Sequence, residues 1–167
     1  MRWAITGTPG TGKTTVGSRL DLDRPIVHIH DLLADDRFIA GEDPSRDTTI
    51  VDLDALSAWV ADQPTNVIIE SHLAHHLPVD RAIVLRCHPE ELCQRLEARN
   101  TASIEENVES ERLDLILVEA IDRIGSDAVF EIDTTGRSIQ EIVTDVEATI
   151  RGETAPRAGI VSFLDES

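Results

Sequence analysis

The chain has little of several things that would place it in large classes of protein. No apolar run approaches the ~20 residues that a membrane-spanning helix needs, which argues against membrane insertion. The two cysteines, Cys87 and Cys93, lack the paired spacing of a zinc site, so we expect two reduced, structural thiols. A strand-like segment begins almost directly after Met1, which leaves no room for a signal peptide and favours a cytoplasmic protein.

Positive charge is scarce as well. Asp and Glu number 32 against 15 Lys and Arg, for a formal net charge of -17, and this balance opposes generic binding to nucleic acid. Lys13 is the one lysine of the chain. An acidic surface with almost no lysine and few aromatics is typical of a halophilic protein from a high-salt cytoplasm, the alternative being an ordinary acidic protein.

What is present indicates one α/β domain. In 167 residues, apolar runs that read as buried strands alternate with amphipathic segments that read as helices, a pattern typical of a parallel sheet. The expected strands are residues 2–6, 26–29, 67–69, 82–85 and 129–132, with 160–164 as a further edge strand. The expected helices are residues 13–20, 31–38, 53–61, 103–124 and 138–150, and one that begins at Pro89.

Local signals mark where several of these helices begin. Asp52 is a plausible N-cap, Pro89 fits a first helical position, and capping boxes begin at Ser103 and Ser138. Residues 41–45, rich in Gly, Pro and acidic residues, read as a loop.

The strongest motif is the P-loop at residues 7–14, GTPGTGKT, which falls between a predicted strand and a predicted helix. Gly10 and Gly12 allow backbone N–H groups to turn inward around phosphates. Lys13 can reach the β- and γ-phosphates, and the Thr14 hydroxyl can bind Mg²⁺. The sequence therefore predicts binding of a nucleoside triphosphate with Mg²⁺.

A P-loop enzyme also needs an acidic group near the magnesium ion, at the end of a neighbouring strand. Glu70 follows the apolar run 67–69 and fits this role, the alternative being a solvated strand end. His72 could orient a water molecule or the carboxylate. Alternatively, His72, His75 and His76 could bind a transition metal.

Two arginines can neutralise the charge that phosphoryl transfer develops. Arg95 and Arg99 lie one helical turn apart, either as catalytic groups or as a surface ion-pair feature, and the loop 100–102 can move as a lid. The loop 133–137 could hold an adenine through its backbone, unless Gly136 simply permits a tight turn. No lysine remains for the base-reading motif of GTPases, which disfavours guanine.

Taken together, GTPGTGKTT, the triplet ESH, and RLEARN after HPEELCQ resemble the small atypical adenylate kinase family. That family comprises archaeal members and the eukaryotic adenylate kinase isoenzyme 6, a nuclear ATPase tied to ribosome assembly. The resemblance implies an α/β, three-layer P-loop NTPase of the nucleoside monophosphate kinase type, with a five-stranded parallel sheet flanked by helices. It implies a domain at 1–151 with a monophosphate-binding segment at about 28–51 and a short lid at about 99–108. The resemblance leaves residues 152–167 unmatched, and their Gly, Pro and acidic residues indicate a loosely held tail.

By motif match, the resemblance assigns ATP binding to Gly10, Gly12, Lys13, Thr14, Thr15 and Arg99. Asp31 matches an aspartate that follows the second strand in the family. Eukaryotic members have Asp-x-His in place of the ESH triplet that begins at Glu70, and an arginine where this chain has Ala34. Arg37 or Arg46 is then expected to contact the monophosphate.

The combined interpretation is an adenylate kinase-like phosphotransferase that converts ATP and AMP, or a related monophosphate, to two ADP. Its expected catalytic residues are Lys13, Arg95, Arg99, Glu70 and His72, with Thr14 and Glu70 on Mg²⁺. The rival interpretation is an ATPase switch that acts as a small-ribosomal-subunit assembly factor and binds a basic ribosomal protein, which an acidic surface suits. A nucleotide-binding module without catalysis would leave Glu70 and both arginines idle.

Overall fold

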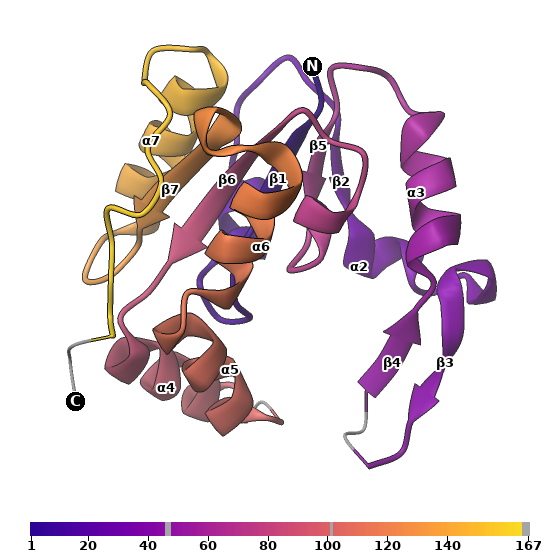
Figure 1. Cartoon of the computed structure of the whole chain (residues 1–167), viewed down its shortest axis with the longest axis horizontal. Helices are drawn as coiled ribbons and strands as arrows, with labels where there is room; N and C mark the ends of the chain where they lie inside the picture. The colour runs from indigo at the N-terminus through magenta and orange to yellow at the C-terminus, as the bar shows by residue number, and fades with distance from the viewer. Residues whose placement is uncertain (46–47, 101, 165–167) are drawn as a thin grey trace.

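Five apolar segments pair as a parallel sheet in the computed structural model of the chain, which describes residues 1–45, 48–100 and 102–164. The strand order is β2-β5-β1-β6-β7, so the first strand of the chain lies at the centre (Figure 1). The strands are β1 (Trp3–Thr6), β2 (Ile26–His28), β5 (Ile68–Glu70), β6 (Arg81–Arg86) and β7 (Val129–Asp133). The predicted five-stranded parallel sheet is confirmed, with each strand end within one residue of its predicted place.

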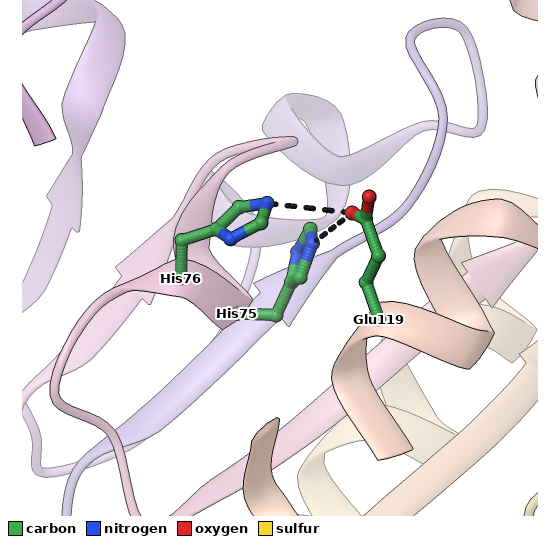
Figure 2. Close-up of side chains that lie close together, drawn as sticks. All are labelled: His75, His76 and Glu119. Carbon is green, nitrogen blue, oxygen red and sulfur yellow. Dashed lines mark hydrogen bonds and ion pairs between the residues drawn. The ribbon is translucent and has the colours of Figure 1, made fainter. Parts of the chain in front are cut away.

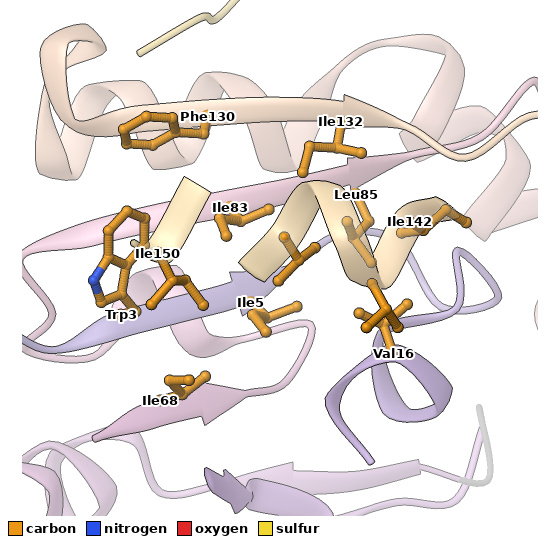
Figure 3. Close-up of a cluster of buried hydrophobic side chains, with 12 residues drawn as sticks. Trp3, Ile5, Val16, Ile68, Ile83, Leu85, Phe130, Ile132, Ile142 and Ile150 are labelled. Atoms are coloured by element: carbon orange, nitrogen blue, oxygen red, sulfur yellow. The ribbon is translucent and has the colours of Figure 1, made fainter. Parts of the chain in front are cut away.

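Helices cover both faces of the sheet and give three layers (Figure 1). Successive side chains of a strand point to opposite faces, so Trp3 and Ile5 enter one core and Ala4 enters the other. Figure 3 shows the first core, in which β-strand side chains meet the helix that carries Ile142 and Ile150. The flanking helices are α1 (Lys13–Gly17) and α7 (Ile139–Ile150) on one face, and α3 (Leu53–Ala61) and α6 (Leu115–Ile124) on the other.

An antiparallel hairpin extends away from the sheet after β2 (Figure 1). The prediction of a helix over 31–38 and a loop at 41–45 is wrong here. The chain instead forms α2 (Ile29–Leu32), a short 3-10 turn η1 (Asp36–Phe38), β3 (Ile39–Asp43) and β4 (Thr48–Val51). Every residue of β4 is β-branched, which favours a strand. β3, which contains Gly and Asp, forms a strand because it pairs with β4.

The predicted helix over 103–124 is two helices, α5 (Ile104–Arg112) and α6. The break falls at Asp114, which has a φ of 55° and pairs through its carboxylate with the buried guanidinium of Arg86. In a continuous helix the Asp114 side chain would point in another direction. The ion pair with Arg86 therefore requires the break in the helix. Before α5 the chain forms α4 (Pro89–Ala98), as the sequence predicted.

All four predicted helix starts are confirmed, and three of them show the predicted local feature. The Asp52 carboxylate accepts a backbone N–H in the first turn of α3, and Pro89 lies in the first turn of α4. Ser138 and Glu141 form the predicted capping box of α7. Ser103 directly precedes α5, but it has a φ of 59° and makes no side-chain cap bond, so the capping box predicted there is wrong.

The segment after α7 runs back along β7 (Figure 1). It forms one isolated bridge, Phe130 to Arg157, and the edge strand predicted at 160–164 is not formed in the part of the tail that the structure describes. The Glu131 carboxylate accepts the backbone N–H of Ile160 at 2.8 Å, and Phe163 is buried. No helix among the described residues is both long enough and apolar enough to cross a bilayer.

Candidate active site

The P-loop wraps from the end of β1 to the start of α1, at the centre of the carboxyl edge of the sheet. Gly10 and Gly12 have φ values of 95° and 99°, which L side chains rarely adopt. A Cβ added at Gly10 would also lie 2.8 Å from Cδ1 of Leu92 on α4. The backbone conformation therefore favours glycine at Gly10, and a side chain there would also have to displace Leu92.

Lys13 lies in the first turn of α1 with 7% of its surface exposed. Its ammonium donates to the carbonyl oxygen of Thr8 at 3.0 Å. Burial lowers its pKa to about 8; the carboxylates of Glu70 and Glu111 oppose this shift, and Arg99 adds to it. The amine is thus held in a poorly solvated site that favours an anionic ligand beside it.

This pKa leads to an expected pH dependence of nucleotide binding. Below pH 8 Lys13 is protonated with or without ligand, so affinity for ATP should change little through this group. Above pH 8 Lys13 of the free protein loses its proton, whereas bound phosphates keep Lys13 protonated. Binding of ATP should then take up one proton, and the affinity should fall by about tenfold per pH unit. Calorimetry in buffers of different ionisation enthalpy measures both quantities. An affinity that stays constant from pH 7 to 9 would contradict the expectation.

Glu70 ends β5 next to the P-loop, because β5 pairs directly with β1 in the sheet. Its buried carboxylate lies 3.4 Å from the Thr14 hydroxyl through Oε1 and 2.7 Å from Nδ1 of His28 through Oε2. His28 ends β2, the next strand outward. A hydroxyl and a carboxylate oxygen side by side are donors that Mg²⁺ prefers, so these residues fit that ion.

Gly17 leaves space for the contact between Glu70 and His28. A Cβ at Gly17 would lie 3.1 Å from Cε1 of His28 and 3.5 Å from Cγ of Glu70. The absence of a side chain in this turn of α1 therefore lets the imidazole and the carboxylate pack directly behind Thr14.

His72 lines the same cavity as Lys13 and Glu70. Burial first, and then the positive charge of Lys13, lower the pKa of His72 to about 4, so the imidazole is neutral at physiological pH. A neutral imidazole can accept or donate a hydrogen bond without adding charge.

The two arginines separate in the structure. Arg99, the residue directly after α4, lines the phosphate cavity. Arg95 is engaged by the protein itself: it donates to the carbonyl oxygen of Gly10 at 3.4 Å, to Thr134 at 3.3 Å, and it pairs with Glu91. Arg99 can therefore contact a ligand in the cavity, whereas Arg95 supports the P-loop backbone at Gly10.

Two cavities adjoin at this edge of the sheet. The first, of about 250 Å³, contains the P-loop residues, Glu70 and Arg99. The second, of about 940 Å³, lies between the hairpin and helices α5 and α6. Pro9 and His72 line both, so a group in one cavity can approach a group in the other across these two residues.

Several predicted residues lie away from these cavities. Gly136 lines neither one, and its N–H donates to the Glu91 carboxylate at 2.8 Å. Arg37 pairs with Asp35 at 2.8 Å and is largely exposed outside both cavities. Arg46 lies outside the described residues. The Gly10, Gly12, Thr14 and Thr15 positions do line the phosphate cavity.

Sequence reasoning missed three residues of the site. His28 and His30 follow the apolar segment of β2, and the rule that identified Glu70 at a strand end would have found them too. Glu111 accepts from the Thr8 hydroxyl at 2.5 Å, which ties α5 to the P-loop. The two residues are 103 positions apart, and no local pattern in the sequence indicates such a contact.

Comparison with known proteins gives matches along the full chain. A family model described as an AAA domain matches residues 4–114. A protein named "Putative adenylate kinase" from Natronomonas pharaonis is 43% identical over 167 residues and covers 99% of both chains. Proteins of the same name from Halobacterium salinarum and Methanosarcina acetivorans are 44% and 41% identical, covering 99% and 90% of this chain and 99% and 86% of their own.

Solved structures match at the level of the fold. A gluconokinase from Sinorhizobium meliloti 1021 superposes with a TM-score of 0.58 at 16% identity, covering 91% of this chain and 92% of its own. An uncharacterized protein from Eubacterium ventriosum gives 0.57 at 13% identity, with 91% and 98% covered. These likenesses support the three-layer α/β P-loop fold predicted from the sequence.

Proposed function

The chain belongs to the adenylate kinase-like P-loop family that its archaeal relatives represent, and from this premise we propose that it transfers the γ-phosphoryl group of ATP to AMP or a related nucleoside monophosphate. As a member of that family it is a nucleotide kinase. The proposal concerns the acceptor and the residues that act on it.

The observation that carries the proposal is the pair of adjoining cavities. A triphosphate held by the P-loop fills the smaller one, and the larger one, of about 940 Å³, is of a size that takes a nucleotide. A cavity for hydrolysis alone needs room for a water molecule only. The shared wall at Pro9 and His72 brings an acceptor phosphate next to the γ-phosphoryl group.

The chain's own groups supply the positioning and the charge that in-line transfer requires. The backbone of the P-loop holds the phosphates, and the Lys13 ammonium and Arg99 guanidinium stabilise negative charge on the transferred group. Thr14 and Glu70 would hold Mg²⁺, which neutralises phosphate charge when it is bound. His28 fixes the orientation of Glu70, and neutral His72 can donate to an acceptor oxygen.

The test is ADP formation from ATP with and without AMP. We expect AMP to raise the rate by about tenfold or more, because a bound acceptor phosphate is oriented where water is not. Two ADP should form for each AMP consumed. A rate that is independent of AMP but stimulated by a basic small-subunit ribosomal protein would instead support an ATPase assembly factor.

A Glu70→Gln variant serves as the control in the same assay. It keeps the size of the side chain but removes the charge beside Thr14. The AMP-dependent rate of the variant should therefore be lower than that of the unmodified chain. An AMP-dependent rate equal to that of the unmodified chain would show that a contaminating kinase produces the signal.

A further inference from the structure

Two histidines and a glutamate meet outside the phosphate cavity, between the loop after β5 and helix α6 (Figure 2). His75 and His76 lie in the 3-10 turn η2 (Ala74–His76), and Glu119 lies on α6. Nε2 of His75 is 3.0 Å and Nε2 of His76 is 3.3 Å from the same Glu119 oxygen. The sequence had suggested His72 as the third member of this group, but the structure places His72 in the phosphate cavity and Glu119 here.

The spacing of the three atoms suits one small cation. Each residue offers one ligand atom, and these atoms all lie within 4.8 Å of one another. Tetrahedral Zn²⁺ with ligands at about 2.0–2.1 Å places neighbouring ligand atoms about 3.3 Å apart. The two nitrogen–oxygen separations are therefore already close to those of coordinated ligands. Two imidazoles and one carboxylate are also a ligand set that zinc sites use.

The contacts of His75 are compatible with a metal-binding tautomer. The Thr6 hydroxyl lies 2.9 Å from Nδ1 of His75 and 3.3 Å from the carbonyl oxygen of His72. With its proton on Nδ1, His75 donates to Thr6 and presents the lone pair of Nε2, which lies 3.0 Å from the Glu119 carboxylate, to a cation.

Packing holds the two imidazoles in place beside the carboxylate. The side chains of His75 and His76 are 1% and 17% exposed, so little rearrangement is needed for both to face one ion. Thr6 supports His75 from behind in the way that outer hydrogen-bond partners support metal ligands. Glu119 is half exposed, so an ion can enter from solvent.

We propose that His75, His76 and Glu119 form a binding site for Zn²⁺ or a similar first-row divalent cation, separate from the Mg²⁺ site at Glu70 and Thr14. The ion clamps η2 to α6. Because Thr6 directly precedes the P-loop and His72 lies two residues before η2, the clamp holds two edges of the phosphate cavity in place. The role is structural positioning, and the ion takes no part in phosphoryl transfer.

The test is equilibrium dialysis of the whole chain against Zn²⁺, without nucleotide and with excess Mg²⁺ to occupy oxygen sites. We expect one Zn²⁺ per chain. Glu119→Gln and His76→Asn should each weaken binding by about tenfold or more, since each removes one of three ligands. Asp122→Asn is the matched control, because Asp122 is an exposed acid on the same helix and outside the ligand group, and its affinity should be unchanged.

A second measurement guards against variants that fail to fold. Zn²⁺ at about 100 times its dissociation constant should raise the Tm of the unmodified chain and of Asp122→Asn by about 5–10 °C, and that of Glu119→Gln far less. The proposal is overturned if no stoichiometric Zn²⁺ binds, if the ligand variants bind as tightly as the control, or if Asp122→Asn weakens binding as much as they do. In those cases the three residues form a plain ion-paired cluster.

Discussion

Replacing Lys13 by methionine is expected to lower the rate of ADP formation from ATP and AMP by about 10²–10³-fold. Methionine has a similar length and fills the same space, so the P-loop should keep its shape while it loses the ammonium. That ammonium is buried between the P-loop and Glu70, where little water can replace its charge. The loss should fall mainly on kcat, because charge on the transferred group is greatest in the transition state.

Lys13→Arg separates charge from geometry in the same experiment. A guanidinium keeps the positive charge but is planar and wider than an ammonium. The buried site beside Thr8 fits the compact ammonium of Lys13. We therefore expect Lys13→Arg to recover a minor part of the rate. Thermal melts of both variants should match the parent chain. Near-full activity of Lys13→Met would remove the basis for phosphoryl transfer at this site.

The second large effect concerns stability. Replacing Arg86 by methionine is expected to lower the free energy of unfolding by about 3–5 kcal/mol, measured by urea denaturation. Arg86 is buried at the end of β6, where its guanidinium pairs with Glu111 at 2.8 Å, with Glu131 at 2.5 Å, and with Asp114. Removing it leaves Glu111 and Glu131 buried without the cation that compensates them.

A surface pair provides the matched control. Arg151→Met removes the same type of side chain from an i,i+4 pair with Glu147 at 3.0 Å on the exposed end of α7. Such pairs contribute only about 0.3–0.5 kcal/mol, because water and salt screen them. Equal losses in the two variants would mean that the buried network contributes no more than a surface pair.

The sheet could be predicted from the sequence because its signals are local. Strands buried on both faces appear in the sequence as short apolar runs. The P-loop and the capping box at Ser138 each indicate that a helix follows. The same logic placed Lys13, Thr14 and Glu70 in one cavity, because parallel strands end at a common edge of the sheet. Arg99 followed from its position at the end of α4.

Two of the features that escaped prediction depend on contacts between distant segments. The helix break at Asp114 follows from an ion pair with Arg86, 28 positions earlier in the chain. The hairpin of β3 and β4 pairs neighbouring segments, and it was missed because the Gly, Pro and acidic residues of 41–45 suggested a loop. Glu119 joins His75 only once α6 has packed beside η2, so no spacing in the sequence could have named it as the third member of that cluster.

The buried, weakly basic amine of the P-loop is also the chain's one lysine, which gives the protein a built-in chemical reporter. An amine-directed acylating reagent finds two targets on this chain, the α-amino group and Lys13. A pKa of about 8 leaves much of Lys13 unprotonated, and therefore nucleophilic, in mildly alkaline solution. The extent of acylation at one identifiable peptide would then record how fully nucleotide occupies the P-loop, without a substitution or a coupled assay.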